Sequence, residues 1–226
     1  MNALLNAVGI HSSHPKAPIT NPVAMEILVV LILFFFFAVV RGRLSVESPG
    51  GLQHVFEGLH GFIDDQGHEI IGHHHEPYVA FLATIFIYVL ACNMIGLVPG
   101  FESPTANPAV PLGIAICAFL YYNFNGIKKL GLLGYAKHFA GPLPALAPLM
   151  IPIEMVSNLA RVMSLTIRLY ANMFAGDMVT LVFFSLVPAV VPVAFLGLHI
   201  GVSFLQAYIF TLLTMVYLQG AVAEEH

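Results

Sequence analysis

One arginine stands inside a long apolar run of this sequence. Arg168 lies between Met155 and Phe184, and the nearest other charged residues are Arg161 and Asp177. An arginine side chain stays protonated at any ordinary pH, and a charge near the centre of a bilayer costs ~3 kcal/mol even on the most lenient scale. A charge in such a place has no structural justification, so it predicts a role in moving or binding ions.

Arg168 belongs to a polar stripe on one face of a predicted helix. Seven residues make nearly two helical turns, so residues at seven-residue and three- or four-residue offsets share a face. The stripe consists of Glu154, Ser157, Arg161, Ser164, Arg168 and Asn172. Asp177 lies nine residues beyond Arg168, roughly half a turn round, and is expected to point away from the stripe.

A second polar stripe follows in the last apolar run. It consists of His199, Ser203, Gln206 and Tyr217. If the two helices pack antiparallel about Pro188, Arg168 falls at nearly the depth of Gln206, and Asp177 falls at the depth of His199. A carboxylate beside an imidazole inside a membrane is typical of a proton relay, whereas the serines and the tyrosine serve equally well as links between helices.

Composition places these stripes in a membrane. The chain has 226 residues, of which 58% are hydrophobic and 9% are charged, and its mean hydropathy is +0.87. Soluble domains have roughly 25% charged residues. Cys92 and Cys117 lie in different apolar runs, so they indicate buried thiols rather than a disulfide framework or a metal site. We therefore expect an all-α polytopic membrane protein.

The chain is predicted to form a single membrane domain over residues 1–226 with five membrane-crossing helices. A helix needs ~20 residues to cross the hydrocarbon, so the first three apolar runs are single spans, while the last two are long enough to be strongly tilted. Helical apolar spacing without the length to span predicts an interfacial amphipathic helix over residues 51–63. The five runs are Ala24–Val40, Tyr78–Val98, Ala109–Phe124, Ile153–Leu186 and Ala189–Val222.

Basic residues predict the orientation. Arg41 and Arg43 follow the first span, and Lys128, Lys129 and Lys137 follow the third. These residues should lie in the cytoplasm, which places the N-terminus (residues 1–23) outside, the C-terminus inside, and the interfacial helix on the cytoplasmic surface. Residues 1–21 have no basic region leading an apolar stretch, so the first span itself should direct insertion.

Other chemistry is weakly supported. Residues 68–75 are rich in histidine, but His68 and Glu69 do not start an HExxH motif, and three adjacent histidines do not converge on one metal. A solvated cytoplasmic loop is expected there, with no metal and no cofactor. No phosphate-binding loop is present, so the chain is expected not to be an enzyme by itself. A secondary transporter would usually show internal repeats, and a membrane metalloenzyme would need several histidine clusters at one depth; neither pattern is found.

Three segments resemble one family. Residues 164–177 (Ser-Leu-Thr-Ile-Arg-Leu-Tyr-Ala-Asn-Met-Phe-Ala-Gly-Asp) closely resemble the signature of the a subunit of F-type ATP synthase, the membrane stator beside the ring of c subunits. Residues 152–157 (Pro-Ile-Glu-Met-Val-Ser) and 205–210 (Leu-Gln-Ala-Tyr-Ile-Phe) resemble its other two motifs. The order of the elements agrees over essentially the whole chain.

The resemblance implies a role for each polar residue. In this family two aqueous half-channels meet the ring near mid-membrane, and an essential arginine separates them. Arg168 would be that arginine, hydrogen-bonded by Gln206, with Asn172 and Ser164 at the same interface. Asp177 and His199 would form the outer half-channel, and Glu154 would serve the inner one. These proton-translocation residues are Arg168, Gln206, Asp177, His199, Asn172, Ser164 and Glu154.

The resemblance also implies the partners and leaves some questions open. The partners would be the c-subunit ring, the b-subunit peripheral stalk and the other ATP synthase subunits in the bacterial inner (plasma) membrane, with no nucleic acid. The family often has a carboxylate before an Asn-Thr pair at the third span, but residues 105–111 here read Thr-Ala-Asn-Pro-Ala-Val-Pro. Asn107 or Glu102 could take that place. Both H⁺ and Na⁺ remain open as the coupling ion.

Overall fold

The computed structural model describes residues 21–42, 50–98, 101–140, 147–186 and 190–222, and every regular element within these ranges is helical. Five of the helices are long and apolar enough to cross a membrane: α2, α4, α5 as far as Gly131, α6 and α7. The prediction of an all-α polytopic protein is therefore confirmed. The elements are α2 (Asn21–Arg41), α3 (Gly51–Ile71), α4 (Glu76–Ile95), the 3₁₀ turn η1 (Pro104–Ala106), α5 (Ala109–Ala140), α6 (Ala147–Leu186) and α7 (Val190–Val222).

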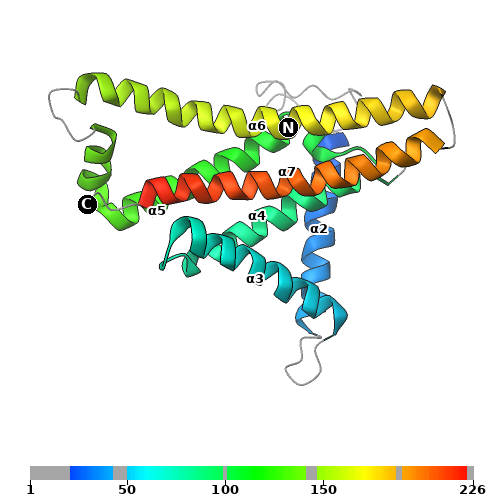
Figure 1. Cartoon of the computed structure of the whole chain (residues 1–226), viewed down its shortest axis with the longest axis horizontal. Helices are drawn as coiled ribbons and strands as arrows, with labels where there is room; N and C mark the ends of the chain where they lie inside the picture. The colour runs from blue at the N-terminus through cyan, green and yellow to red at the C-terminus, as the bar shows by residue number, and fades with distance from the viewer. Residues whose placement is uncertain (1–20, 43–49, 99–100, 141–146, 187–189, 223–226) are drawn as a thin grey trace.

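The two long helices, α6 and α7, lie side by side and antiparallel, and they run crosswise to α2 (Figure 1). The strong tilt expected of the last two spans within the membrane stays a prediction. Helix α5 packs against both α6 and α7, and helix α4 packs against α7. Helix α3 packs against α4 and α7. Helix α2 lies at the edge of the bundle, mainly against α4, and Val29 is its one buried residue among those described.

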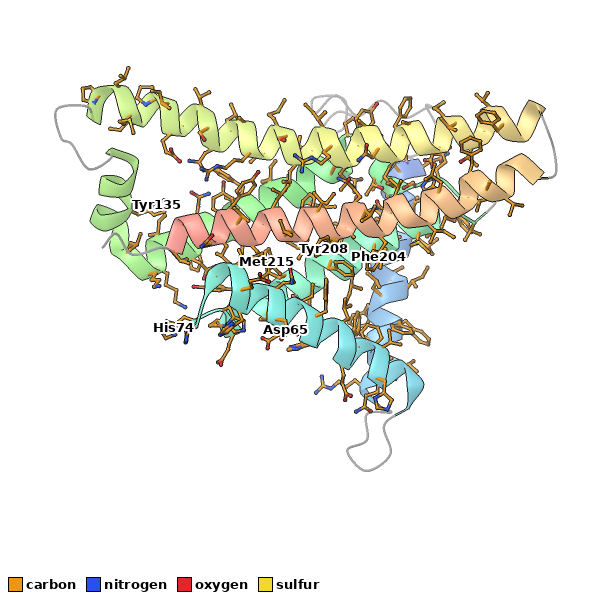
Figure 2. The ribbon with its side chains drawn as sticks, in the orientation of Figure 1. Asp65, His74, Tyr135, Phe204, Tyr208 and Met215 are labelled. Atoms are coloured by element: carbon orange, nitrogen blue, oxygen red, sulfur yellow. The ribbon has the colours of Figure 1, made fainter. Side chains whose placement is uncertain are left out.

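One apolar core joins the five helices α3 to α7. Its most completely buried side chains include Ile63 of α3, Leu82 and Val89 of α4, Leu169 of α6 and Phe210 of α7. Tyr208 extends from α7 toward α3 (Figure 2), where its hydroxyl donates a hydrogen bond to Gln66 Oε1 at 3.0 Å. The core therefore fixes the pair α6–α7, which carries the polar stripes, on a scaffold of three other helices.

Helix α3 is longer than the predicted interfacial helix, which ended at residue 63. The polar residues that follow Ile63 do not end the helix because their side chains find partners: Asp64 lies beside His75, and Gln66 accepts a hydrogen bond from Tyr208. Ile70 then packs against the core. The apolar stripe thus continues past the polar stretch.

The expected histidine-rich loop is only partly a loop. Residues 68–71 belong to α3, and the turn to α4 occupies residues 72–75. His75 is buried rather than solvated, with Nδ1 2.9 Å from Gly72 O and Nε2 2.9 Å from Asp64 Oδ1. His75 is therefore a structural link between α3 and α4.

Helix α5 continues well past the predicted end of the third span at Phe124. Gly131 interrupts it with φ 73° and ψ 164°, a conformation that is strained for residues with a side chain. The segment after Gly131 turns away from the span (Figure 1), and Tyr135 Oη donates a hydrogen bond of 2.6 Å to Asn123 Oδ1. Burial raises the pKa of the Tyr135 hydroxyl. This hydrogen bond ties the segment after Gly131 to the span.

Candidate functional site

Arg168 lies near the middle of the α6 span, which covers Pro148–Phe183. Its side chain is partly exposed, and Nη2 donates a long hydrogen bond of 3.4 Å to Ser164 Oγ, one turn earlier. Within the described residues no carboxylate lies within ion-pair distance of its guanidinium. Among the residues that the structure describes, the charge is therefore stabilised by one neutral hydroxyl group.

Gln206 contacts α6 one turn away from the position expected. Its Oε1 accepts a hydrogen bond of 2.8 Å from Asn172 Nδ2, and among the described residues it forms none with Arg168. Ser203 lies against Met173 with its Oγ 4.0 Å from Sδ, which in an antiparallel pair places Gln206 level with Tyr170, midway between Arg168 and Asn172. The buried Gln206 is thus at a depth between the two side chains, and it bonds to Asn172.

Asp177 and His199 lie close together, as their equal distance in sequence from Pro188 predicts. Asp177 Oδ1 lies 3.7 Å from His199 Nε2, which is just beyond hydrogen-bonding distance. His199 is 6% exposed, and Nε2 is buried without a hydrogen-bond partner among the described residues. Gly176 makes this approach possible, because a Cβ there would lie only 3.1 Å from the imidazole.

Glu154 lies at the other end of α6 with partners of its own. Its Oε1 is 3.5 Å from Arg161 Nη2 and accepts a hydrogen bond of 3.3 Å from Asn158 Nδ2. The Arg161 guanidinium also lies 5.3 Å from the centre of the Tyr217 ring. Arg161 is thus paired within the bundle, unlike Arg168.

The chain is similar over nearly its whole length to one family of proteins. The family model described as ATP synthase A chain matches residues 23–219. The ATP synthase subunit a of Solibacter usitatus is 57% identical over 226 residues, which cover 100% of this chain and 96% of the relative. The corresponding protein of Koribacter versatilis is 52% identical over 226 residues, which cover 100% of this chain and 92% of the relative.

The chain belongs to the ATP synthase A chain family. It is thus a multi-pass membrane subunit of the bacterial ATP synthase complex, with a part in ATP synthesis and proton transport. More distant members agree, since the ATP synthase subunit a 3 of Pelobacter propionicus is 43% identical over 200 residues, which cover 88% of this chain and 86% of the relative. The matched residues include both polar stripes.

In this member of the ATP synthase A chain family, Arg168 borders an exposed face of α6. Small side chains recur along that face at four-residue intervals, as Ala160 with Ser164 and Ala171 with Ala175, and all four are exposed. Large apolar side chains flank them, including Ile167, which is 54% exposed. Small residues in this spacing let another membrane helix approach closely.

A buried polar network next to α7 was missed by sequence reasoning. Thr105 Oγ1 donates a hydrogen bond of 2.7 Å to Asn93 Oδ1, and Asn93 Nδ2 donates one of 3.3 Å to Ser203 O. Ser103 Oγ lies 2.8 Å from Thr105 Oγ1 and donates to Cys92 O at 3.1 Å. The one available signal was an asparagine at the end of an apolar run.

The segment before α5 contains Asn107 and Glu102, the two residues that the sequence left open. Asn107 Oδ1 accepts a hydrogen bond of 3.0 Å from the amide of Ala109, so it caps α5. η1, which follows Glu102, packs against α6, the helix that carries Asp177. A role for Glu102 in the outer half-channel stays a prediction.

Proposed function

We propose that this chain is the proton-conducting stator subunit of the ATP synthase membrane sector, with two half-channels separated by Arg168 beside a rotating c-subunit ring. The observation that supports it most directly is the position of Arg168. Its charge lies near mid-span, on an exposed face, without a carboxylate partner in the described part of the chain. Charges inside membrane spans usually pair with another charge or mark an ion path, so an unpaired one on an exposed face supports a partner from outside the chain.

The chemistry of that partner follows from the charge. A carboxylate ~4 Å from the guanidinium would gain ~4 kcal/mol of attraction at the dielectric constant typical near a protein surface, enough to offset a burial cost of ~3 kcal/mol. Arg168 therefore favours the ionised form of each arriving ring carboxylate and release of its proton. The attraction must end when the ring turns, so a permanent partner within the chain would defeat the mechanism.

Asn172 and Gln206 set the environment of Arg168. Asn172 lies one turn after Arg168 and is exposed, while the buried Gln206 holds the Asn172 amide at 2.8 Å. Ser164 holds the guanidinium from the preceding turn. Gln206 thus acts as a positioning residue through Asn172, which keeps an amide beside the charge where the ring passes.

Asp177 and His199 would carry protons in the outer half-channel. Their separation of 3.7 Å is one that a bridging water molecule can serve. Both groups can gain and lose protons, which a relay requires. Asp177 lies nine residues from Arg168, or ~14 Å along the helix, so protons would cross that distance through water or other polar groups before they reach the ring.

Glu154 would serve the inner half-channel. It lies 14 residues before Arg168, or ~21 Å along the helix in the direction opposite to Asp177. Its contacts with Arg161 and Asn158 keep polar groups together at that end of α6. Helix α6 thus has Glu154 toward one end, Asp177 toward the other, and Arg168 between them without a carboxylate partner in the described residues. This order supports two half-channels that do not meet.

The basic residues set the proposed orientation of the chain in the membrane. The N-terminus lies outside and the C-terminus in the cytoplasm, in accordance with Lys128 and Lys129 after the third span. The chain forms one membrane domain and works with the b-subunit peripheral stalk, while nucleotide chemistry belongs to other subunits of the complex.

Cross-linking tests the proposed contact with the ring. In a background with Cys92→Ala and Cys117→Ala, a cysteine at Ala171 should cross-link to a ring subunit, because it lies on the exposed face beside Arg168. A cysteine at Phe35, which is 72% exposed on α2, is the control and should not. Equal cross-linking at both positions, or at neither, would contradict the proposal.

A further inference from the structure

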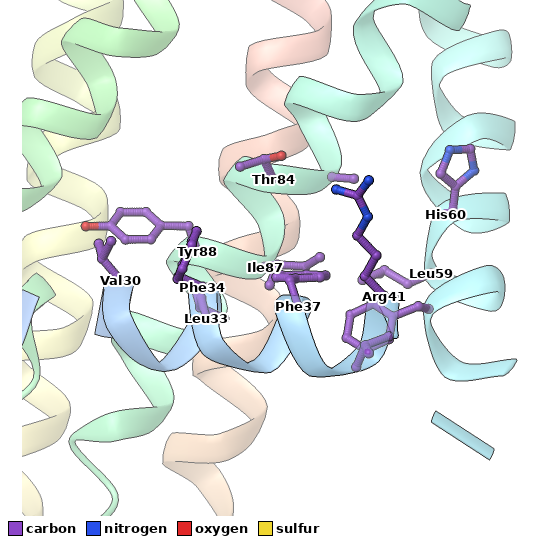
Figure 3. Close-up of a pocket in the computed structure, with 13 residues that line it drawn as sticks. Val30, Leu33, Phe34, Phe37, Arg41, Leu59, His60, Thr84, Ile87 and Tyr88 are labelled. Atoms are coloured by element: carbon purple, nitrogen blue, oxygen red, sulfur yellow. The ribbon is translucent and has the colours of Figure 1, made fainter. Parts of the chain in front are cut away.

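A cavity of about 580 Å³ lies between α2, α3 and α4, away from the polar stripes of α6 and α7. Its walls are mostly apolar, as with Leu33 and Phe37 of α2, Leu59 of α3 and Ile87 of α4 (Figure 3). The volume is within the range of ~300–1,000 Å³ that holds small-molecule ligands. Because the cavity opens beside a membrane span, its natural occupant is a hydrophobic molecule of the bilayer.

The polar groups of the cavity are unevenly distributed. Arg41 and His60 lie at one end, and Tyr88 lies at the other (Figure 3). The Tyr88 hydroxyl already donates to Glu26 Oε1 at 3.0 Å, and Thr84 Oγ1 donates to Ala80 O at 2.7 Å. These two hydroxyl groups are therefore occupied within the protein.

Arg41 is the charge that remains available. Within the described residues its guanidinium has neither a carboxylate within ion-pair distance nor a hydrogen-bond acceptor. Its guanidinium offers five N–H groups in a fork that suits phosphate oxygens. A basic end on an apolar cavity between membrane helices is the chemistry that binds anionic lipid head groups.

The length of the cavity fits a lipid. From Val30 to Arg41 the α2 helix rises ~16 Å, which is close to one leaflet, or half of ~30 Å of hydrocarbon. Acyl chains of that length can lie along α2 and α4 with the head group at the Arg41 end of the cavity.

We infer that this cavity binds an anionic phospholipid, with its phosphate on Arg41 and His60 and its acyl chains between α2 and α4. The lipid fills space that the protein leaves open and ties the peripheral α2 to the bundle. The site is separate from the proton path, so it holds whether or not the proposed half-channels are correct.

Photolabelling of the purified complete complex tests the site. The probe is a phosphatidylglycerol that carries a photoactivatable group in its acyl chain, and phosphatidylcholine with the same chain is the neutral comparison. We expect phosphatidylglycerol to label the lining residues Leu33, Phe37, Ala83 and Ile87 roughly fivefold more than phosphatidylcholine, the factor for one basic residue at an anionic surface. Equal labelling by both lipids, or cross-linking of a protein chain in the cavity instead, would overturn the inference.

Variants separate the head-group contact from the cavity. Arg41→Gln should lower labelling by phosphatidylglycerol to the level of phosphatidylcholine, while Arg41→Lys keeps the charge and should retain most of it. Leu33→Trp fills the cavity and should reduce labelling by both lipids. Lys128→Gln and Phe35→Trp are the matched controls, because Lys128 is on α5 and Phe35 lies outside the cavity. Labelling that survives both Arg41→Gln and Leu33→Trp would contradict the site.

Discussion

Two regions of this bundle place polar side chains inside the membrane, and they differ in how well those side chains are satisfied. Around α4, η1 and α7, the side chains of Asn93, Ser103 and Thr105 are buried and each one has hydrogen-bond partners in the protein. Along α6 and α7, Arg168 has only a long bond to a hydroxyl, and His199 Nε2 has none among the described residues.

Whether a polar side chain has a partner within the chain distinguishes structural from functional residues better than its polarity does. A polar group saturated inside the chain stabilises one arrangement of helices. A buried group without a partner costs free energy, so it persists where something outside the fold uses it. We therefore expect substitutions in the first region to change stability and substitutions in the second to change proton movement.

The largest effect is expected for Arg168→Ala. It should abolish ATP synthesis and ATP-driven proton pumping while the complex still assembles, because removal of an unpaired charge relieves a desolvation cost. ATP synthesis in membrane vesicles, measured with equal amounts of assembled complex, checks this. Near-normal synthesis would show that the unpaired charge is not what couples the ring to proton flow.

Asp177→Leu should lower proton flux by about 100-fold, the lower range for loss of a group that transfers protons. Ser203→Ala is the matched control on the neighbouring helix, because the Ser203 hydroxyl lies against the sulfur atom of Met173 in the described part of the chain and does not titrate as a carboxyl does. Pumping rates in the same vesicles compare the two. Similar rates for both variants would remove Asp177 from the proton path.

Gln206→Leu should slow pumping by roughly fivefold, the factor for the ~1 kcal/mol of one hydrogen bond. Because Gln206 holds Asn172, Asn172→Ala should have a similar effect, and the double variant should be no slower than either one. Pumping assays on the three variants check this. Additive losses would mean that Gln206 acts on Arg168 by a route other than Asn172.

Thr105→Val should leave pumping per assembled complex unchanged and lower the stability of the chain by about 1–3 kcal/mol, since Asn93 Oδ1 loses its donor. Thr84→Val is the control, because Thr84 is exposed and bonds only to its own helix. Thermal unfolding of the purified complex measures both. Loss of pumping without loss of stability in Thr105→Val would place this network in the proton path.

The sequence predicts what depends on composition and helical spacing. Five spans follow from apolar runs, and the stripe of Glu154, Arg161 and Arg168 follows from seven-residue spacing. The depth match of Asp177 and His199 also follows, because both are eleven residues from Pro188.

Contacts between distant segments could not be predicted in the same way. The partner of Gln206 depends on a small offset in how α6 and α7 pack, which no residue count fixes. The Asn93 network joins residues 110 positions apart, and His75 is buried only because α3 continues past its polar stretch. Gly131 ends the straight part of α5 through its backbone conformation, which composition does not reveal.

The central claim is that the charge of Arg168 separates two half-channels, and passive proton leak tests it most directly. Vesicles that contain the complex are given a pH gradient without nucleotide, and its decay is followed for the wild type, Arg168→Ala and Arg168→Lys. Arg168→Ala should leak because ring carboxylates can then pass between the half-channels while protonated. Arg168→Lys keeps the charge and should leak less, although it loses the planar fork and still fails in synthesis. A gradient that decays in Arg168→Ala vesicles as slowly as in the wild type would contradict the claim.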